Sequence, residues 1–239
     1  MRMPSKTAPI STRYVAKDED PFSSHSLILA KVGDGYGRRL LDVGSAQGVL
    51  AERFTQRGFE VTCIEGDSQL AALAQSRCHK VICVDLEGPL PQLEGQFDVI
   101  VYGDILEHLK NPLEVFRGLN DYLAPGGTVV VSVPNIAHLF VRLSLLVGRF
   151  EYMERGILDR THLRFFTLAS FRRFLLQAGV AAVEICATPV PLYLAWPASK
   201  DRLWLRTLQC LNAALARVWK ALFGYQFVAV ARAGGKHGT

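Results

Sequence analysis

The 239-residue sequence predicts an α/β fold in which helices cover both faces of a mainly parallel β-sheet. First, short apolar runs typical of buried strands alternate along the chain with segments of helical periodicity. Second, the apolar run at 39–43 leads through a glycine turn into a helical segment at 49–57. Third, the next two apolar runs each end in a carboxylate, Glu65 and Asp85. These features place polar groups at the carboxyl edge of a sheet, where α/β proteins bind nucleotides.

The glycine turn is the strongest of these signals. Gly44 and Gly48 allow the backbone to approach a ligand where a side chain would block it. The helix that follows presents free N–H groups and the positive end of its dipole to the same place. We therefore expect an anionic or nucleotide-like ligand beside this turn.

The order of these features resembles that of the class I S-adenosylmethionine (SAM) methyltransferases. In that family the glycine loop holds the methionine end of SAM, and the acids after the second and third strands hold the ribose and the adenine. The resemblance implies a Rossmann-like seven-stranded sheet, SAM as cofactor and S-adenosylhomocysteine as product. The cofactor-binding positions that it implies are Asp42, Gly44, Ser45, Ala46, Gly48, Glu65, Gly66, Asp85, Leu86, Gly103 and Asp104. Ala46 stands where the family has its middle glycine, and we expect a negative φ there.

The remaining elements follow in order. A helix is expected at 22–32 and another at 68–77, which Ser68 could cap. The near-continuous apolar run at 97–102 is typical of a strand buried on both faces. Pro112 starts a helix to about Leu123, and the Pro-Gly turn at 124–127 breaks it. Further strands are expected at 60–64, 80–84, 128–133, 180–187 and 224–231, with a helix at 168–178; the family places the last strand antiparallel to the rest.

Residues 1–22 are polar and are predicted to form a flexible N-terminal arm, while 23–239 form one SAM-dependent methyltransferase domain. Insertions at 136–167 and 188–223 interrupt the pattern, and we expect them to form a cap over the substrate. The first 22 residues have no apolar core typical of a signal peptide, and no uncharged apolar run reaches the roughly 18 residues of a membrane span. Five cysteines without a C-x-x-C pair indicate reduced thiols and a cytoplasmic location.

Charge is divided unevenly along the chain. Residues 1–136 carry 13 basic and 17 acidic side chains, whereas residues 137–239 carry 14 basic and 5 acidic ones. A basic half suits an anionic substrate, a nucleic acid or an anionic membrane surface, and the alternative is a solvated face that binds nothing. Nucleic acid is disfavoured, because the cations are spread over apolar insertions and no RNA-binding motif is visible.

Candidate catalytic residues follow the strand at 97–102. Methyl transfer to an oxygen requires removal of a proton by a base or a metal. The run Asp104-Ile-Leu-Glu107-His108 resembles the E-x-x-E-H pattern of ubiquinone-type O-methyltransferases and of the methyltransferases of small-RNA 3′ ends, where it can hold a divalent metal. His108 or a second histidine, His162 of the first insertion, is the favoured base. A divalent metal on Asp104, Glu107, His108 and His162 is the less favoured alternative, and in a third interpretation Glu107 and His108 only orient the loop.

The run from Asp159 to Phe166 is dense in hydrogen-bonding groups. We expect both phenylalanines of this run in the core, Asp159 paired with Arg160 or Arg164, and His162 facing the site. The segment resembles bacterial methyltransferases of cell-surface polysaccharide and secondary-metabolite synthesis, which implies a sugar or small-molecule hydroxyl as acceptor.

A helix is predicted at 203–223, with tryptophans and leucines on one side and arginines between them. This pattern fits peripheral contact of residues 202–223 with the inner face of a membrane. A helix that caps the substrate pocket or forms a dimer is the favoured alternative.

The function predicted is O-methylation by SAM of a sugar, a lipid-linked glycan or another small hydroxyl compound. An RNA or N-directed methyltransferase and a non-catalytic SAM-binding partner protein are the alternatives. An NAD-dependent oxidoreductase is disfavoured, because the turn lacks the G-x-G-x-x-G spacing.

Overall fold

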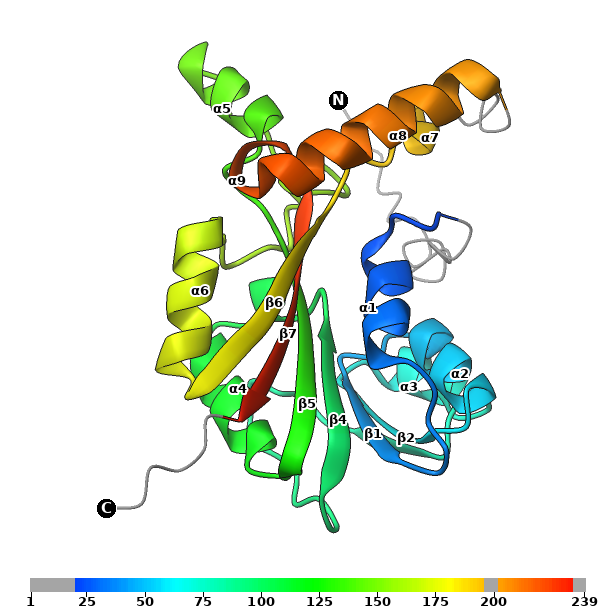
Figure 1. Cartoon of the computed structure of the whole chain (residues 1–239). Helices are drawn as coiled ribbons and strands as arrows, with labels where there is room; N and C mark the ends of the chain where they lie inside the picture. Colours follow the sequence, from blue (N-terminus) through cyan, green and yellow to red (C-terminus); the bar gives the residue numbers. More distant parts are fainter. Residues whose placement is uncertain (1–19, 196–201, 234–239) are drawn as a thin grey trace, which may run out of the picture.

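The computed structural model describes residues 20–195 and 202–233, and it contains the predicted seven-stranded sheet (Figure 1). The strand order is β3-β2-β1-β4-β5-β7-β6. Strands β1 to β5 pair in parallel, and β7 is antiparallel to both of its neighbours, as the family resemblance implies. The strands are β1 (Arg39–Val43), β2 (Glu60–Glu65), β3 (Lys80–Cys83), β4 (Phe97–Gly103), β5 (Leu123–Pro134), β6 (Val180–Thr188) and β7 (Gln226–Ala233).

Helices cover both faces of the sheet and bury a separate apolar cluster on each. Ile28 and Phe54 belong to the cluster under the first group of helices, and Phe116 and Phe174 belong to the cluster under the second. The first group, on the right in Figure 1, is α1 (Ser24–Val32), α2 (Val49–Gln56) and α3 (Ser68–Ala74); the second, on the left, is α4 (Pro112–Asn120) and α6 (Leu168–Gln177).

The predicted break at 124–127 is wrong, because β5 already begins at Leu123. Leu123 pairs with Phe97 and Thr128 pairs with Val99. An advance of five residues along β5 therefore corresponds to two residues along β4. The Pro-Gly-Gly turn is therefore a bulge within the strand rather than a gap before it. The helix α4 ends at Asn120, earlier than expected, so that Leu123 can enter the sheet.

The predicted cap of α3 is also wrong by one residue. Asp67 is the N-cap, and its Oδ1 accepts hydrogen bonds from the N–H groups of Gln69 and Leu70. A carboxylate at this position satisfies two helical donors and complements the helix dipole.

The two insertions carry the remaining helices, which extend beyond the carboxyl end of the sheet (Figure 1). The first contains α5 (Leu139–Leu146), and the second contains α7 (Leu192–Ala195), α8 (Leu203–Val218) and α9 (Lys220–Phe223). The single helix predicted at 203–223 is divided at Trp219, whose φ of −129° and ψ of 71° are not helical. Within the described ranges, no helix has the length and apolarity needed to cross a membrane. Of the predicted N-terminal arm, residues 1–19 lie outside the described part of the chain.

Candidate functional site

The sheet brings the predicted cofactor residues to one edge. Asp42 lies in β1, Glu65 ends the adjacent β2, and Asp85 follows β3. Because these neighbouring strands are parallel, their carboxyl ends meet where Gly103 ends β4 and Asp104 follows it. The predicted neighbours fit the same edge, since Gly66 lies beside Asp85 and the side chain of Leu86 is buried. The cofactor role of these residues remains a prediction.

The glycine turn is required by packing as well as by any ligand. Gly44 has a φ of 73°, and a Cβ there would lie 2.6 Å from side-chain atoms of Ile105. Gly48 has a φ of 76°, and its Cβ would lie 3.0 Å from the Cα of Ala74 in α3. The N–H groups of Gly44 and Ser45 both donate to the carbonyl of Ile64, which holds the turn against β2. The turn is thus preformed by the protein itself.

We expect Gly44→Ala to lower the free energy of unfolding by about 3 kcal/mol, because it combines a left-handed backbone with a collision. Gly148→Ala is the matched control, since Gly148 has a φ of 71° and a Cβ there would meet nothing within 4 Å. That control isolates the backbone cost of about 1 kcal/mol. Urea unfolding measures the free energy of unfolding of both variants. Equal losses would show that the Ile105 side chain moves away at no cost.

Ala46 corrects the expectation of a negative φ, because its φ is 50°. Its N–H donates to Glu65 Oε2 at 2.8 Å, and the N–H of Asp67 donates to Oε1 of the same carboxylate at 2.9 Å. A hydrogen bond at the end of β2 therefore holds the alanine in a conformation that glycine usually adopts. An ionised carboxylate has about four acceptor sites, so Glu65 retains capacity for the hydroxyls of a ribose.

Asp42 is a buried carboxylate at the carboxyl edge of the sheet. Its side chain is buried, and Oδ2 has no hydrogen-bond partner among the residues that the structure describes. Burial and the charge of Glu65 raise the pKa of Asp42 to about 7. A buried acceptor of this kind is costly unless a donor reaches it. A cationic donor from a ligand would satisfy such an acceptor.

The histidines predicted to be catalytic lie together. His108 is in the 3-10 helix η2 (Leu106–His108), directly after β4, and its ring centroid lies 4.8 Å from that of His162. The N–H groups of Leu163 and Arg164 donate to the carbonyl of Glu107, which fastens the first insertion to η2. One potential ligand atom from each of Glu107, His108 and His162 lies within 4.8 Å of the other two.

Contacts to backbone carbonyls orient both histidines. Nδ1 of His162 lies 3.1 Å from the carbonyl oxygen of Ile157, and Nδ1 of His108 lies 3.3 Å from that of Thr161. A carbonyl can only accept, so Nδ1 is the donor in these two contacts, and a neutral ring with that tautomer carries its lone pair on Nε2. Thr161 Oγ1 also lies 3.2 Å from Nδ1 of His108. Burial and the nearby charge of His162 lower the pKa of His108.

Asp104 is not one of the three residues whose ligand atoms gather within 4.8 Å, and its role as a fourth metal ligand stays a prediction. Its carboxylate accepts hydrogen bonds from Ser24 Oγ at 3.0 Å, Ser132 Oγ at 2.6 Å and Gln226 Nε2 at 2.9 Å. These donors come from α1, β5 and β7, so Asp104 joins three elements at the carboxyl edge. Asp104 has a φ of 55°, a left-handed conformation that is strained for a residue other than glycine.

The loop before α6 differs from its predicted pairing. Asp159 accepts hydrogen bonds from the N–H and Oγ1 of Thr161, whereas Arg160 pairs with Glu154 and Arg164 donates to the carbonyl of Lys110. Although burial opposes them, the two donors of Thr161 and the charges of His162 and His108 lower the pKa of Asp159. Of the two phenylalanines expected in the core, Phe166 is buried and Phe165 is 37% exposed.

Tyr225 and Asn135 are neighbours of the site that the sequence analysis missed. Burial and the charge of Asp104 raise the pKa of Tyr225 to about 12. Asn135, fully buried after β5, donates from Nδ2 to the carbonyl of Gly224 at 2.8 Å. No spacing signal identifies them, because only the insertion of β7 beside β5 brings Tyr225 to this edge.

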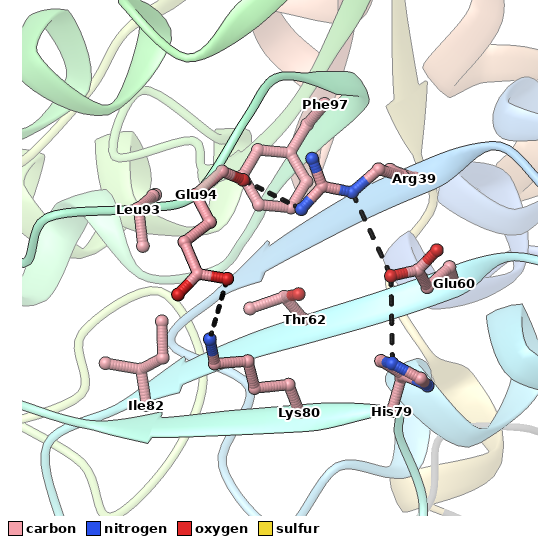
Figure 2. Close-up of a pocket in the computed structure, with 9 residues that line it drawn as sticks. All are labelled: Arg39, Glu60, Thr62, His79, Lys80, Ile82, Leu93, Glu94 and Phe97. Atoms are coloured by element: carbon pink, nitrogen blue, oxygen red, sulfur yellow. Dashed lines mark hydrogen bonds and ion pairs between the residues drawn. The ribbon is translucent and has the colours of Figure 1, made fainter.

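A cavity of about 220 Å³ lies at the opposite, amino edge of the sheet (Figure 2). Its charges are paired within the protein: Arg39 and His79 lie 4.0 and 3.7 Å from Glu60, and Lys80 lies 3.7 Å from Glu94. This cavity is therefore separate from the predicted site, and it contributes no residue to it.

Comparisons with known proteins agree with this arrangement. A family model described as a methyltransferase domain matches residues 16–185. A ubiquinone biosynthesis O-methyltransferase from Pseudomonas aeruginosa is 34% identical over 155 residues, which cover 61% of this chain and 62% of that protein. Another with the same name, from Aeromonas salmonicida, is 31% identical over 161 residues, covering 64% of this chain and 67% of that one. The chain thus spans about 62% of the length of the first relative.

Solved structures share the fold. A SAM-dependent methyltransferase from Archaeoglobus fulgidus matches with a TM-score of 0.57 and 16% identity, over 87% of this chain and 93% of that one. A magnesium protoporphyrin IX methyltransferase from Synechocystis with bound S-adenosylhomocysteine matches with a TM-score of 0.57 and 15% identity, over 87% and 78%. At these identities the likeness concerns the fold alone.

Proposed function

Because the chain belongs to the methyltransferase domain family, we propose that it transfers a methyl group from SAM to a hydroxyl oxygen of a small molecule. The family match and the seven-stranded sheet make it a class I SAM-dependent methyltransferase. The observation that carries the proposal is the pair of adjacent histidines at the carboxyl edge of the sheet, each with Nδ1 on a backbone carbonyl. Sugars, lipid-linked glycans and phenol-like compounds are the acceptor classes proposed.

Three carboxylates would bind the cofactor in this proposal. Asp42 receives the ammonium group of the methionine portion, because its buried Oδ2 lacks a donor within the described residues. Glu65 accepts the ribose hydroxyls, while its bonds from Ala46 and Asp67 hold it in place. Asp85 and Leu86 contact the adenine through a carboxylate and a buried apolar side chain. When bound, SAM supplies a methyl group already activated by a sulfonium.

The histidine pair supplies the base. Nε2 of His162 or His108 takes the hydroxyl proton of the acceptor while the oxygen lone pair forms the new C–O bond. The S–C bond of bound SAM would break with its electron pair passing to sulfur, and S-adenosylhomocysteine would be the leaving group. The hydrogen bonds from Nδ1 to backbone carbonyls fix both rings for this task.

The same cluster has the chemistry of a divalent metal site. Glu107, His108 and His162 offer one carboxylate and two imidazole ligands, and histidines that bind metals characteristically donate their other N–H to a carbonyl. These three residues would hold the ion, which would lower the pKa of an acceptor hydroxyl as a Lewis acid.

A methyl-transfer assay tests the function. We expect radiolabel from methyl-labelled SAM to enter a hydroxyl compound from a panel of catechols, sugars and glycan precursors, and mass spectrometry to place the new methyl on oxygen. Label in RNA or on nitrogen would contradict the acceptor class while leaving the cofactor intact. Failure to bind SAM in calorimetry would contradict the whole proposal.

A further inference from the structure

Helix α5 exposes apolar side chains around nearly its whole circumference. Val141 is its one buried residue, while Leu146 is 81% exposed and Val147, directly after the helix, is 69% exposed. Figure 1 shows α5 standing away from the sheet at the carboxyl end of the strands. A helix that is apolar all round is normally buried in a core or in lipid. This helix therefore has a surface that the described protein does not cover.

Helix α8 adds a second apolar surface at the same end of the molecule (Figure 1). Its inner side buries Leu205, Ala213 and Ala216 against the protein. The opposite side exposes large apolar residues at helical spacing, namely Leu208, Leu211, Leu215, Val218 and, just beyond the helix, Trp219. The α5–α8 surface is defined here as these residues together with the exposed apolar residues Phe140, Leu143, Leu145, Leu146 and Val147.

Fixed contacts hold α8 with this side outward. Asn212 Nδ2 donates to the carbonyl of Val190 at 2.9 Å, and Lys220 Nζ donates to that of Ile185 at 2.6 Å. Val190 lies just beyond the end of β6 and Ile185 lies within it, while Lys220 is the first residue of α9, directly after α8. The apolar stripe is consequently a permanent feature of the surface.

The two segments that carry this surface contain cations and no acids. The segments 139–150 and 202–233 contain no aspartate or glutamate. Their exposed cations include Arg142, Arg149, Arg206 and Arg217. A second copy of the chain would place cations against cations, whereas an anionic bilayer offers hydrocarbon to the leucines and negative headgroups to the arginines.

We propose that the α5–α8 surface docks the protein on an anionic lipid bilayer. Helix α8 lies in the interface rather than across it, because its 16 residues extend about 24 Å, less than a bilayer core. Docking turns the carboxyl edge of the sheet, with its histidine pair, toward the lipid. The inference goes beyond the proposed methyl transfer and does not require it.

Flotation of the full-length protein with vesicles tests this docking. Phosphatidylglycerol-containing vesicles should carry the protein upward, and pure phosphatidylcholine vesicles should carry much less. The Leu211→Gln/Leu215→Gln variant should bind at least about tenfold more weakly, because two apolar anchors are lost. Arg206→Gln/Arg217→Gln should weaken binding to the anionic vesicles by about fivefold per arginine and reduce its sensitivity to salt.

Leu176→Gln is the matched control, since Leu176 is 71% exposed on α6, outside the α5–α8 surface. It should float like the wild type. Circular dichroism confirms folding of each variant, and calorimetry with SAM follows the cofactor site separately. Three results would each overturn the proposal: no flotation with anionic vesicles, equal flotation with phosphatidylcholine, or a dimer in sedimentation velocity that Leu211→Gln/Leu215→Gln dissociates.

Discussion

We expect Asp42→Asn to stabilise the ligand-free protein at pH 8 and to weaken SAM binding by about a hundredfold or more. Burial and the charge of Glu65 raise the pKa of Asp42 from 3.8 to about 7. The folded protein therefore holds a proton that the unfolded chain releases, so stability falls as pH rises from about 4 to 7. At pH 8 the ionisation of buried Asp42 lowers the free energy of unfolding by at most roughly 4 kcal/mol. The neutral amide of the variant avoids this loss.

The same titration makes cofactor binding depend on pH. Below pH 7 the free protein carries a proton on Asp42, which must leave before the carboxylate receives the ammonium group of SAM. We therefore expect the affinity of the wild type to fall by up to about tenfold for each pH unit below 7. The amide variant should lose this dependence, because it has no proton to release.

Thermal unfolding and calorimetry with SAM, each at pH 5 and pH 8, measure both effects. Asp121→Asn is the control, since Asp121 is an exposed carboxylate at the end of α4. It should leave the melting temperature and the affinity unchanged. A melting temperature of Asp42→Asn below that of the wild type at pH 8 would show that the carboxylate is stabilised by a group not considered.

The sheet was predictable from the sequence because its strands are apolar runs that end in turns. Periodicity identifies these runs, and the parallel arrangement then places Asp42, Glu65 and Asp85 at one edge without further information. Caps and bulges were less predictable. The cap of α3 depends on whether Asp67 or Ser68 accepts the hydrogen bond from the first helical N–H groups. The bulge after Leu123 depends on which residues of β5 pair with β4.

Long-range hydrogen bonds explain the larger errors at the site. Asp104 begins the motif that ends at His108, yet its carboxylate accepts hydrogen bonds from Ser24 and Gln226, which are remote in sequence. Ala46 adopts a left-handed conformation because Glu65 accepts its N–H. Neither contact has a local signature. By contrast, His162 was predicted from the insertion, and the backbone bonds to Glu107 bring it to His108.

We expect His162→Asn to reduce turnover by about a hundredfold or more with little change in SAM affinity. Asparagine can donate to the carbonyl of Ile157 as Nδ1 of the histidine does, but it lacks the Nε2 base. His79→Asn is the control, because His79 is exposed at the amino edge of the sheet and pairs with Glu60. Steady-state rates and calorimetry separate the two effects. Equal losses of turnover and affinity would make His162 a structural residue.

The pH dependence of turnover distinguishes a histidine that acts as the base from one that only positions its neighbours. Burial and the charge of His162 lower the pKa of His108, so His108 should take up a proton at a lower pH than an ordinary histidine. Removal of His162 removes one of the charges that oppose protonation, so the acid limb of the residual activity should move to higher pH. Addition and chelation of divalent cations during the same assay test the metal role. If the Glu107→Gln variant loses cation-dependent thermal stabilisation but keeps the acid limb of the wild type, Glu107 binds the ion and the histidines supply the base.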